Sequence, residues 1–170
     1  MTKGDVRGKT PFAAPEPEFA LPLEPPITDP PRTVERRVQF AALPWRAGDG
    51  DRVEVMLMTS RETRRWVIAK GWPIKGLAPN MTASREAYEE AGVEGYVSMR
   101  PLGSYVYDKR KPSGRLQPVQ VEVYPLQVTV EHDDWPEQFE RDKLWLSPQD
   151  AAARVDDPGL KALLAAFRPV

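Results

Sequence analysis

The chain has 170 residues, a formal net charge of −1 and 29% charged residues. That length suits one domain with a hydrophobic core and a tail. The absence of cysteine and the single histidine exclude disulfide scaffolds, thiolate nucleophiles and metal sites built from several imidazoles. Any catalysis must therefore depend on carboxylates, lysine, tyrosine or hydroxyl groups.

The net charge and the lack of long apolar runs argue against nucleic acid and membrane partners. A nearly neutral chain has no global field that attracts nucleic acid or an anionic membrane, so a charged substrate must be recognised by a local patch. No apolar run approaches the roughly 20 residues needed to cross a bilayer. The beginning of the chain also lacks the apolar segment of a secretory signal. We therefore expect a cytoplasmic protein with neither a membrane partner nor a nucleic acid partner.

The first 32 residues differ in composition from the rest, because eight of the 19 prolines lie there. Proline fixes φ and removes a hydrogen-bond donor, so helices and interior strands are disfavoured in such a segment. We expect residues 1–32 to form a proline-rich, mobile extension and residues 33–170 to form the folded domain.

Apolar segments predict three strands in the first part of this domain. Residues 37–45 and 53–59 are the first two, and the turn signal at residues 47–51 predicts that they form a hairpin. Residues 66–68 are a short apolar run, which we interpret as a buried strand.

A helix is predicted next. Residues 71–79 form a loop with two glycines and two prolines, and residues 81–91 have helical character. Asn80 is the expected N-cap, and Gly92 stands where a glycine in the left-handed conformation stops a helix.

The second half of the domain again has strand patterns. Residues 97–107 predict one strand or a bent pair, followed by a loop at residues 108–117. Residues 119–123 and 126–130 both alternate, but in opposite phase, and the change falls at Tyr124-Pro125. A bulge or an edge kink at that proline is the expected explanation.

The last predicted elements are a short strand at residues 143–146 and two helices. Ser147 followed by Pro148 indicates that one helix begins there, and residues 158–167 predict a terminal helix. The order of strands, helix, strands and helices predicts an α/β (α+β) sandwich with a mixed sheet between helices.

Three carboxylates lie on the predicted helix at residues 81–91. Glu86 is separated from Glu90 by four positions and from Glu89 by three, so these side chains share one helical surface. Close carboxylates repel one another without a cation, and hard oxygen ligands suit Mg²⁺ or Mn²⁺. Such a metal polarises a phosphoryl group and lowers the pKa of a bound water. The alternative is a solvated acidic face whose charge Arg85 relieves.

The segment from Gly71 to Val93 resembles the Nudix box, G-x5-E-x7-R-E-U-x-E-E-x-G-U, in which U is a bulky apolar residue. The matching positions are Gly71, Arg85, Glu86, Glu89, Glu90, Gly92 and Val93. The order of strands and helices is also similar to that of the Nudix family. Two positions depart from the pattern: Leu77 replaces the first glutamate, and Ala87 replaces the first bulky residue.

The resemblance implies a Nudix-type α/β/α sandwich and a role for each residue of the acidic run. Glu86 and Glu90 would bind the metal, Glu89 would be the general base or a further ligand, and Arg85 would orient the glutamates through a salt bridge. In the family, the glutamate missing at Leu77 supports the box loop. We therefore expect an altered loop at this position rather than a lost metal site.

Cations near the box are expected to bind substrate phosphates. The expected substrate-binding residues are Lys70, Gly71, Lys75, Lys109, Arg110 and Arg115. Two stretches, residues 66–73 and Trp135-Pro136-Glu137 with Trp145, resemble the diphosphoinositol-polyphosphate and diadenosine-polyphosphate branch of the family. The resemblance therefore implies a small polyphosphorylated substrate.

Taken together, these features predict a Nudix hydrolase that acts on phosphorus-containing anhydrides. The expected reaction is metal-dependent cleavage of a phosphate–phosphate bond in a diphosphoinositol polyphosphate or a dinucleoside polyphosphate. The alternative is a catalytically weak or inactive Nudix scaffold that binds a phosphorylated ligand or a protein partner. Leu77 is the feature that favours this alternative.

Overall fold

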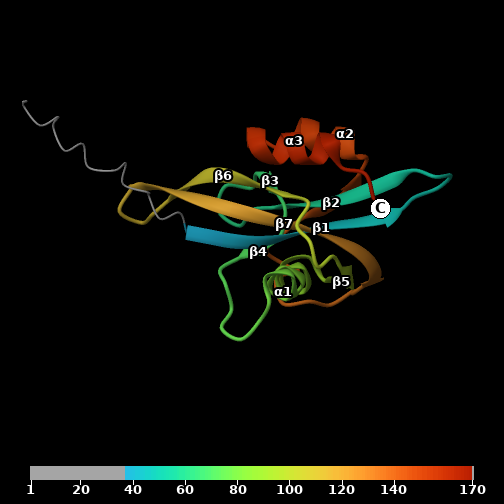
Figure 1. The fold of residues 1–170 in the computed structure, drawn as a ribbon, viewed down its shortest axis with the longest axis horizontal. Helices are drawn as coiled ribbons and strands as arrows, with labels where there is room; N and C mark the ends of the chain where they lie inside the picture. The colour runs from blue at the N-terminus through green and yellow to red at the C-terminus, as the bar shows by residue number, and fades with distance from the viewer. Residues whose placement is uncertain (1–36, 170) are drawn as a thin grey trace, which may run out of the picture. The chain divides into compact units, whose positions relative to one another are not determined.

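The computed structural model describes residues 37–169, so the predicted proline-rich extension at residues 1–32 lies outside the described residues. Figure 1 shows the sheet as a middle layer, with α1 on one face and α2 and α3 on the other. The elements are β1 (Arg37–Ala47), β2 (Val53–Thr59), β3 (Trp66–Val67), β4 (Lys70–Gly71), α1 (Pro79–Ala91), β5 (Val93–Val97), β6 (Gly103–Arg110), β7 (Leu116–Glu131), β8 (Lys143–Leu146), α2 (Pro148–Arg154) and α3 (Pro158–Ala166). The predicted α/β/α sandwich is confirmed.

The strands form one eight-stranded mixed sheet whose main path is β3-β2-β1-β7-β5. β1 is parallel to β7 and antiparallel to β2, and the predicted hairpin of the first two strands is confirmed. Off this path, β4 pairs with β1, β6 with β7 and β8 with β2. Because β4 pairs with β1, Gly71 lies opposite Phe40, and the box loop starts from inside the sheet.

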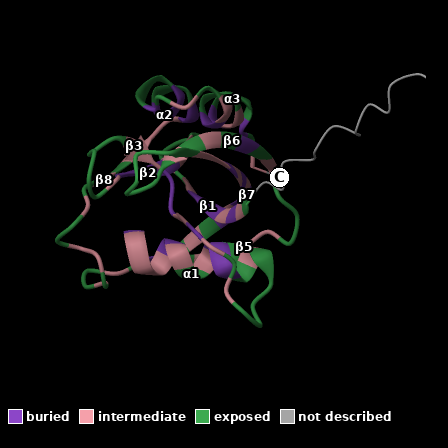
Figure 2. Ribbon diagram, turned by 90° about the vertical axis from the view of Figure 1, so that its left-hand side faces the viewer, coloured by how far each residue is buried: buried purple, intermediate pink, exposed green. Residues whose placement is uncertain are grey.

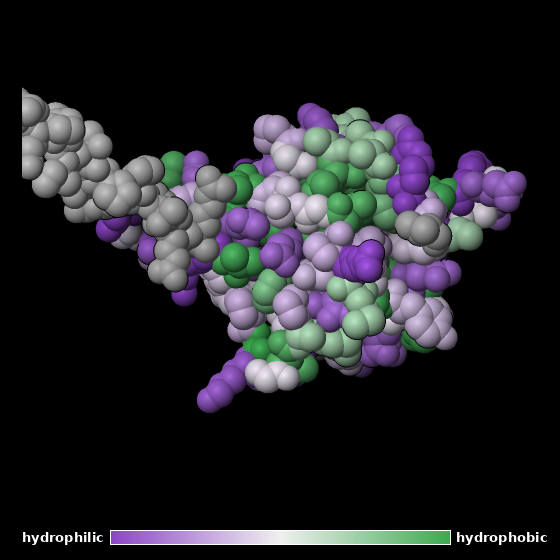
Figure 3. Space-filling model, in the orientation of Figure 1, coloured by the Kyte–Doolittle hydropathy of each residue, from purple (hydrophilic) through white to green (hydrophobic). Residues whose placement is uncertain are grey.

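Both faces of the sheet are buried, since each face is covered by its own helical layer (Figure 2). The core beneath α2 and α3 includes Leu57, Leu164 and Phe167, and the core beneath α1 includes Met56 and Met58. Burying a large apolar side chain contributes about 1.5–3 kcal/mol, so these contacts hold both layers to the sheet. Figure 3 shows hydrophilic and hydrophobic residues interspersed over one outer face.

Of the two explanations offered at Tyr124-Pro125, a bulge or an edge kink, the structure contradicts the bulge, while the neighbour on the other side of β7 changes here from β6 to β5. The register between β1 and β7 runs unbroken through this point, with Ala42 opposite Tyr124. The valines of residues 119–123 are buried beneath α2 and α3, whereas Tyr124 and Leu126 are buried beneath α1. The change of phase therefore marks the point where the apolar side chains pass from one covered face of the sheet to the other.

The strand or bent pair predicted at residues 97–107 is misplaced, since β5 spans Val93–Val97, residues 98–102 are not strand, and β6 begins at Gly103. The loop predicted at residues 108–117 is shorter than expected. The ladder between β6 and β7 extends to the pair Arg110 and Leu116. Polar side chains are tolerated in this ladder because its end is largely exposed.

Helix α1 begins two residues before its predicted start, at Pro79. Ala78 is the N-cap residue, so the prediction that Asn80 caps the helix is wrong. Proline at the first helical position has a preset φ and lacks an N–H group that would need a partner, which permits a start without a side-chain cap. The predicted stop is confirmed, because Gly92 has a left-handed φ of 67° and its N–H donates to Tyr88 O at 2.9 Å.

The last two helices begin where they were predicted. Ser147 Oγ accepts a hydrogen bond from the Asp150 N–H at 3.1 Å, and the Asp157 carboxylate accepts two backbone N–H groups at the start of α3. Within the described part of the chain, none of the helices combines the length and apolar character that a membrane crossing needs.

Candidate active site

Small residues bring the acidic helix close to the sheet. Ala83, Ala87 and Ala91 are buried along one side of α1, so the backbone of the helix approaches the sheet closely. A Cβ atom on Gly71 would overlap the carboxylate of Glu86, so a larger residue at the end of β4 would displace that carboxylate. The first box glycine therefore makes room for a candidate metal ligand.

Glu90 is held from two directions. The Lys70 N–H donates to Glu90 Oε2 at 3.2 Å, and Arg141 Nη2 donates to Glu90 Oε1 at 2.7 Å. Only 14% of the Glu90 side chain is exposed. Burial raises the pKa of Glu90, and Arg141 and Lys70 act in the opposite direction. Both carboxylate oxygens therefore have a fixed orientation.

Glu86 lies beside Glu90, and the charge of Glu90 acts on it. Burial, and then the charges of Glu90 and Glu89, raise the pKa of Glu86 to about 7. A divalent cation would relieve this repulsion, and carboxylate oxygens are the donors that Mg²⁺ and Mn²⁺ prefer.

The donor set fits such a cation only as part of its coordination shell. Among residues 37–169, no three histidine, aspartate or glutamate side chains converge into a complete metal cage. Mg²⁺ is typically bound by one or two carboxylates together with waters and substrate phosphates. Glu86 and Glu90 match that arrangement.

The other two predicted residues of the run form a pair on the solvent side of α1. Arg85 Nε donates to Glu89 Oε1 at 2.8 Å, and 57% of the Arg85 side chain is exposed. The salt bridge that was expected of Arg85 is therefore present, and its partner is Glu89. An exposed pair of this kind contributes only about 0–1 kcal/mol, so its effect is mainly on the orientation of Glu89.

A segment after β7 closes the C-terminal end of α1. The Glu137 N–H donates to Glu89 O at 3.2 Å, the His132 N–H donates to Gly92 O at 2.8 Å, and Lys143 Nζ donates to Ala91 O at 3.1 Å. These carbonyl groups have no partner inside the helix. The helix end thus fixes the segment at residues 132–143 beside the glutamates.

Two charged residues of this segment were missed by sequence reasoning. Arg141 reaches Glu90 across 51 positions and also donates from Nε to Glu137 Oε2 at 2.6 Å. The pattern Trp135-Pro136-Glu137 was noticed as a resemblance, but no spacing rule connects it with α1. The only signal in the sequence was the presence of charged residues shortly after that pattern.

The predicted substrate cations fall into two groups. Lys70 Nζ lies 5.6 Å from the centre of the Tyr107 ring, and Lys109 Nζ lies 5.0 Å from that of Trp72. Loss of hydration lowers the pKa of Lys70, while Glu90 acts in the opposite direction and the charge of Lys109 adds to the lowering. Lys70 is therefore a neighbour of Glu90, and Lys109 lies close enough to Lys70 to act on its pKa.

The other predicted cations are placed differently. Arg110 ends β6 and Arg115 lies in the turn before β7, and Arg110 Nη1 donates to Gly114 O in that turn at 3.5 Å. Lys75 is exposed in the box loop. Their part in substrate binding stays a prediction.

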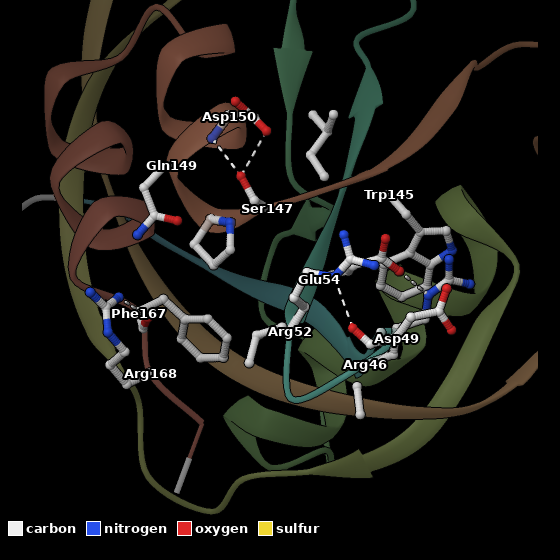
Figure 4. Close-up of a pocket in the computed structure, with 15 residues that line it drawn as sticks. Arg46, Asp49, Arg52, Glu54, Trp145, Ser147, Gln149, Asp150, Phe167 and Arg168 are labelled. Atoms are coloured by element: carbon white, nitrogen blue, oxygen red, sulfur yellow. Dashed lines mark hydrogen bonds and ion pairs between the residues drawn. The ribbon is translucent and has the colours of Figure 1, made fainter.

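Two surface hollows are lined by residues other than Glu86, Glu89 and Glu90. One of about 930 Å³ is lined by the β1–β2 turn, the start of α2 and the end of the chain, and it includes Arg46, Trp145 and Arg168 (Figure 4). The other, of about 540 Å³, lies over the outer face of α1 and β5, and Leu77 is among its residues. Leu77 is thus a surface residue, and its N–H closes a backbone turn onto Ile74 O at 3.0 Å.

The folded part of the chain matches the NUDIX domain model over residues 35–167. The chain belongs to the Nudix family. Diphosphoinositol polyphosphate phosphohydrolase 2 from Rattus norvegicus is 31% identical over 125 residues, which cover 71% of this chain and 65% of the rat protein. Nudix hydrolase 12, mitochondrial, from Arabidopsis thaliana is 33% identical over 106 residues, which cover 59% of this chain. The chain spans about half of that plant protein, since the match covers 51% of it.

Solved Nudix structures have the same fold. A binary complex of C. elegans Ap4A hydrolase superposes with a TM-score of 0.57 and 19% identity, covering 76% of this chain and 93% of the other. The NUDIX domain of Shewanella oneidensis NrtR, complexed with ADP ribose, gives a TM-score of 0.56 and 15% identity, covering 82% of this chain and 92% of the other. At such identities the likeness establishes the fold. The expected Nudix resemblance is confirmed, and the curated relatives named here are hydrolases, as the predicted class requires.

Proposed function

We propose that this Nudix protein is a pyrophosphohydrolase that uses Mg²⁺ or Mn²⁺ to cleave a phosphate–phosphate bond in a small polyphosphorylated substrate. One observation carries the proposal. Glu86 and Glu90 lie together against the end of β4, and their mutual repulsion contributes to the raised pKa of Glu86. A divalent cation is the chemical group that satisfies such a pair, and phosphate oxygens complete its coordination.

Each residue near the pair has a proposed part in the reaction. Glu86 and Glu90 hold the metal, which when bound polarises a phosphoryl oxygen and makes a water more acidic. Glu89 takes a proton from the attacking water on its carboxylate, and Arg85 holds that carboxylate in place. Lys70, whose backbone N–H holds Glu90, donates hydrogen bonds from its ammonium to substrate phosphate oxygens.

For the substrate, we propose a diphosphoinositol polyphosphate or a dinucleoside polyphosphate. The proposal is supported by the name of the rat relative and by two cations, Lys70 beside Glu90 and Lys109, whose charge acts on Lys70. A compound with several phosphates offers enough negative charge to engage both cations and the metal together. A local cationic patch of this kind is needed because the net charge of the chain is only −1.

The test is a substrate panel with product identification. The purified chain is incubated with Mg²⁺ and a diphosphoinositol polyphosphate, a dinucleoside polyphosphate, a nucleotide sugar or capped RNA. Wild type is compared with Glu89→Gln, which removes a proton acceptor and nearly keeps the shape of the side chain. We expect phosphate release from one of the first two compounds and a loss of about 10²–10⁴-fold in the variant. Equal rates for both proteins would refute the assigned chemistry.

A non-catalytic scaffold is the second candidate, and Leu77 favours it because the family pattern has a glutamate there. Such a protein would bind a phosphorylated ligand without turning it over. Calorimetry with inositol hexakisphosphate would then detect binding that is independent of Mg²⁺, and the substrate panel would yield no product.

A further inference from the structure

Arg141 lies where three parts of the fold meet. Its Nη2 donates to Glu90 Oε1 at 2.7 Å, its Nε to Glu137 Oε2 at 2.6 Å and its Nη1 to Thr59 O at 3.1 Å. The guanidinium therefore joins α1, the segment at residues 132–143 and the end of β2. Only 7% of its side chain is exposed, so these hydrogen bonds are shielded from competing water.

Arg141 has a fixed geometry that Arg85 lacks. Arg85 is mostly exposed and holds Glu89, whereas Arg141 is buried and holds Glu90. A guanidinium is planar and donates along fixed directions, so two carboxylates bound to its different nitrogens are oriented relative to each other. The Glu90 carboxylate then has both oxygens fixed, one by Arg141 and one by the Lys70 N–H.

Arg141 also brings a fourth carboxylate to the site. Glu137 is outside the box, and 23% of its side chain is exposed. Its charge is one of those that act on both Glu86 and Glu90. The backbone of Glu137 is anchored on the end of α1, and Arg141 fixes its side chain.

We infer that Arg141 is a positioning residue for the metal site, which sets the orientation of Glu90 and links it to Glu137. The inference rests on the proposed function, because it assumes that Glu90 is a metal ligand. It goes beyond the box, which accounts for the ligands but contains no buried group that orients Glu90 through its side chain. In metal sites, removing a group that orients a ligand typically costs about 10–100-fold in metal affinity or activity.

A structural role for Arg141 is the alternative, since its bond to Thr59 also fastens the segment to β2. Arg64 offers a matched control for that role. Its Nη1 donates to Glu140 O at 2.8 Å and its Nη2 forms an ion pair with Asp142, so it fastens the same segment without touching Glu90. Loss of Arg64 tests the anchoring of the segment alone.

The experiment measures Mn²⁺ binding by electron paramagnetic resonance of the free ion, for wild type, Arg141→Met, Arg141→Lys and Arg64→Ala. Near-UV circular dichroism confirms that each variant is folded. We expect the dissociation constant for Mn²⁺ to rise about 10–100-fold in Arg141→Met. Arg141→Lys should recover part of the affinity, since an ammonium reaches one carboxylate but cannot fix two. Arg64→Ala should bind Mn²⁺ like wild type.

Activity provides a second readout. With the substrate found in the panel, Arg141→Met should lower kcat more than it changes KM at saturating Mn²⁺. Wild-type Mn²⁺ affinity in a folded Arg141→Met protein would overturn the inference, as would an equal loss in Arg64→Ala. If Arg141→Met does not fold, wild-type affinity in Arg141→Lys would overturn it instead. If wild type binds Mn²⁺ but hydrolyses nothing, the proposed function fails while the Mn²⁺ constants still decide the role of Arg141.

Discussion

Gly71→Ala is a sharp test of the contact between the box loop and the acidic helix. The added methyl group would overlap both carboxylate oxygens and the Cδ atom of Glu86. Because these atoms form the end of a flexible side chain, the carboxylate can turn away. The strain of an unfavourable rotamer costs about 0.5–1.5 kcal/mol. Alanine also lowers the conformational entropy of the unfolded chain, which stabilises the folded protein by about 0.4–1 kcal/mol.

The two stability terms nearly cancel, so we expect a change of less than about 1 kcal/mol in the free energy of unfolding. Metal affinity should respond far more, because one of two protein ligands is displaced. We expect Mn²⁺ to bind at least about tenfold more weakly, which corresponds to about 1.4 kcal/mol. Thermal unfolding in EDTA measures the first quantity, and Mn²⁺ titration measures the second.

Gly76→Ala provides the opposite pattern in the same loop. Gly76 has a φ of 84° and open space around its Cα, so alanine strains the backbone without reaching Glu86. This variant should lose about 1–2 kcal/mol of stability and keep its Mn²⁺ affinity. Wild-type Mn²⁺ binding by Gly71→Ala, or a loss of several kcal/mol in its stability, would refute the reasoning about the Glu86 contact.

Three further predictions concern the electrostatic and capping contacts described above: two lie on α1 and its C-cap, and one lies at the start of α2. Burial, and then the charges of Glu90 and Glu89, raise the pKa of Glu86 from 4.5 to about 7. The metal-free fold is therefore stabilised by this group below about pH 4.5 and loses that contribution as the pH rises to about 7. The full shift would be worth about 3 kcal/mol, and solvent screening of this half-buried group reduces it to about 1–2 kcal/mol. Denaturant unfolding of wild type and Glu86→Gln in EDTA at pH 5 and pH 8 checks this, and a constant difference between the two proteins would contradict it. Gly92→Ala forces alanine to a φ of 67° and against the Trp135 ring, with a contact of 2.6 Å. It should cost about 2–3 kcal/mol in thermal unfolding, whereas a loss below 1 kcal/mol would mean that the ring yields easily. Ser147→Ala removes the acceptor at the start of α2 and should cost about 1 kcal/mol. Ser147→Thr is its control, and a neutral result for alanine would show that water replaces the cap.

The parts of the fold that depend on local sequence were predictable. The stop of α1 required a residue that accepts a left-handed φ, and Gly92 supplied it at the right position. The start of α2 combined an N-cap hydroxyl with a proline, two signals that act within one turn. The start of α1 was misplaced because Asn80 offered a familiar cap, whereas the proline before it made a cap unnecessary.

The misreading of β7 has a different physical cause. Alternation of period two identifies which residues share a face, but it does not say whether the other face is also buried. Here each face has its own helices, so the strand buries Val123 on one side and Tyr124 on the other. A sheet that is covered on both faces produces neighbouring buried residues without any bulge.

The residues of the candidate site also differ in whether local sequence could predict them. Glu86, Glu89 and Glu90 were recognisable because the spacing on one helix places them together. Arg141 was not, since its approach to Glu90 depends on how the segment after β7 folds back onto the end of α1. No periodic pattern records a contact between residues 51 positions apart.

Leu77, which replaces the first glutamate of the box pattern, belongs to the box loop and not to the proposed metal site. Leu77 is 39% exposed on the outer surface, while its N–H and the left-handed Gly76 close the loop as a backbone turn. The carboxylates of Glu86 and Glu90 are instead oriented by Gly71, the Lys70 N–H and Arg141.

The loop and the ligands thus rely on separate contacts. A glutamate at position 77 would support a loop whose turn is already closed by the backbone. Its absence leaves the donor set of the proposed metal site intact. Leu77 makes none of the contacts that orient the residues that would hold the metal, so it gives no structural reason for lost catalysis. Only a measurement of turnover can therefore support the scaffold alternative.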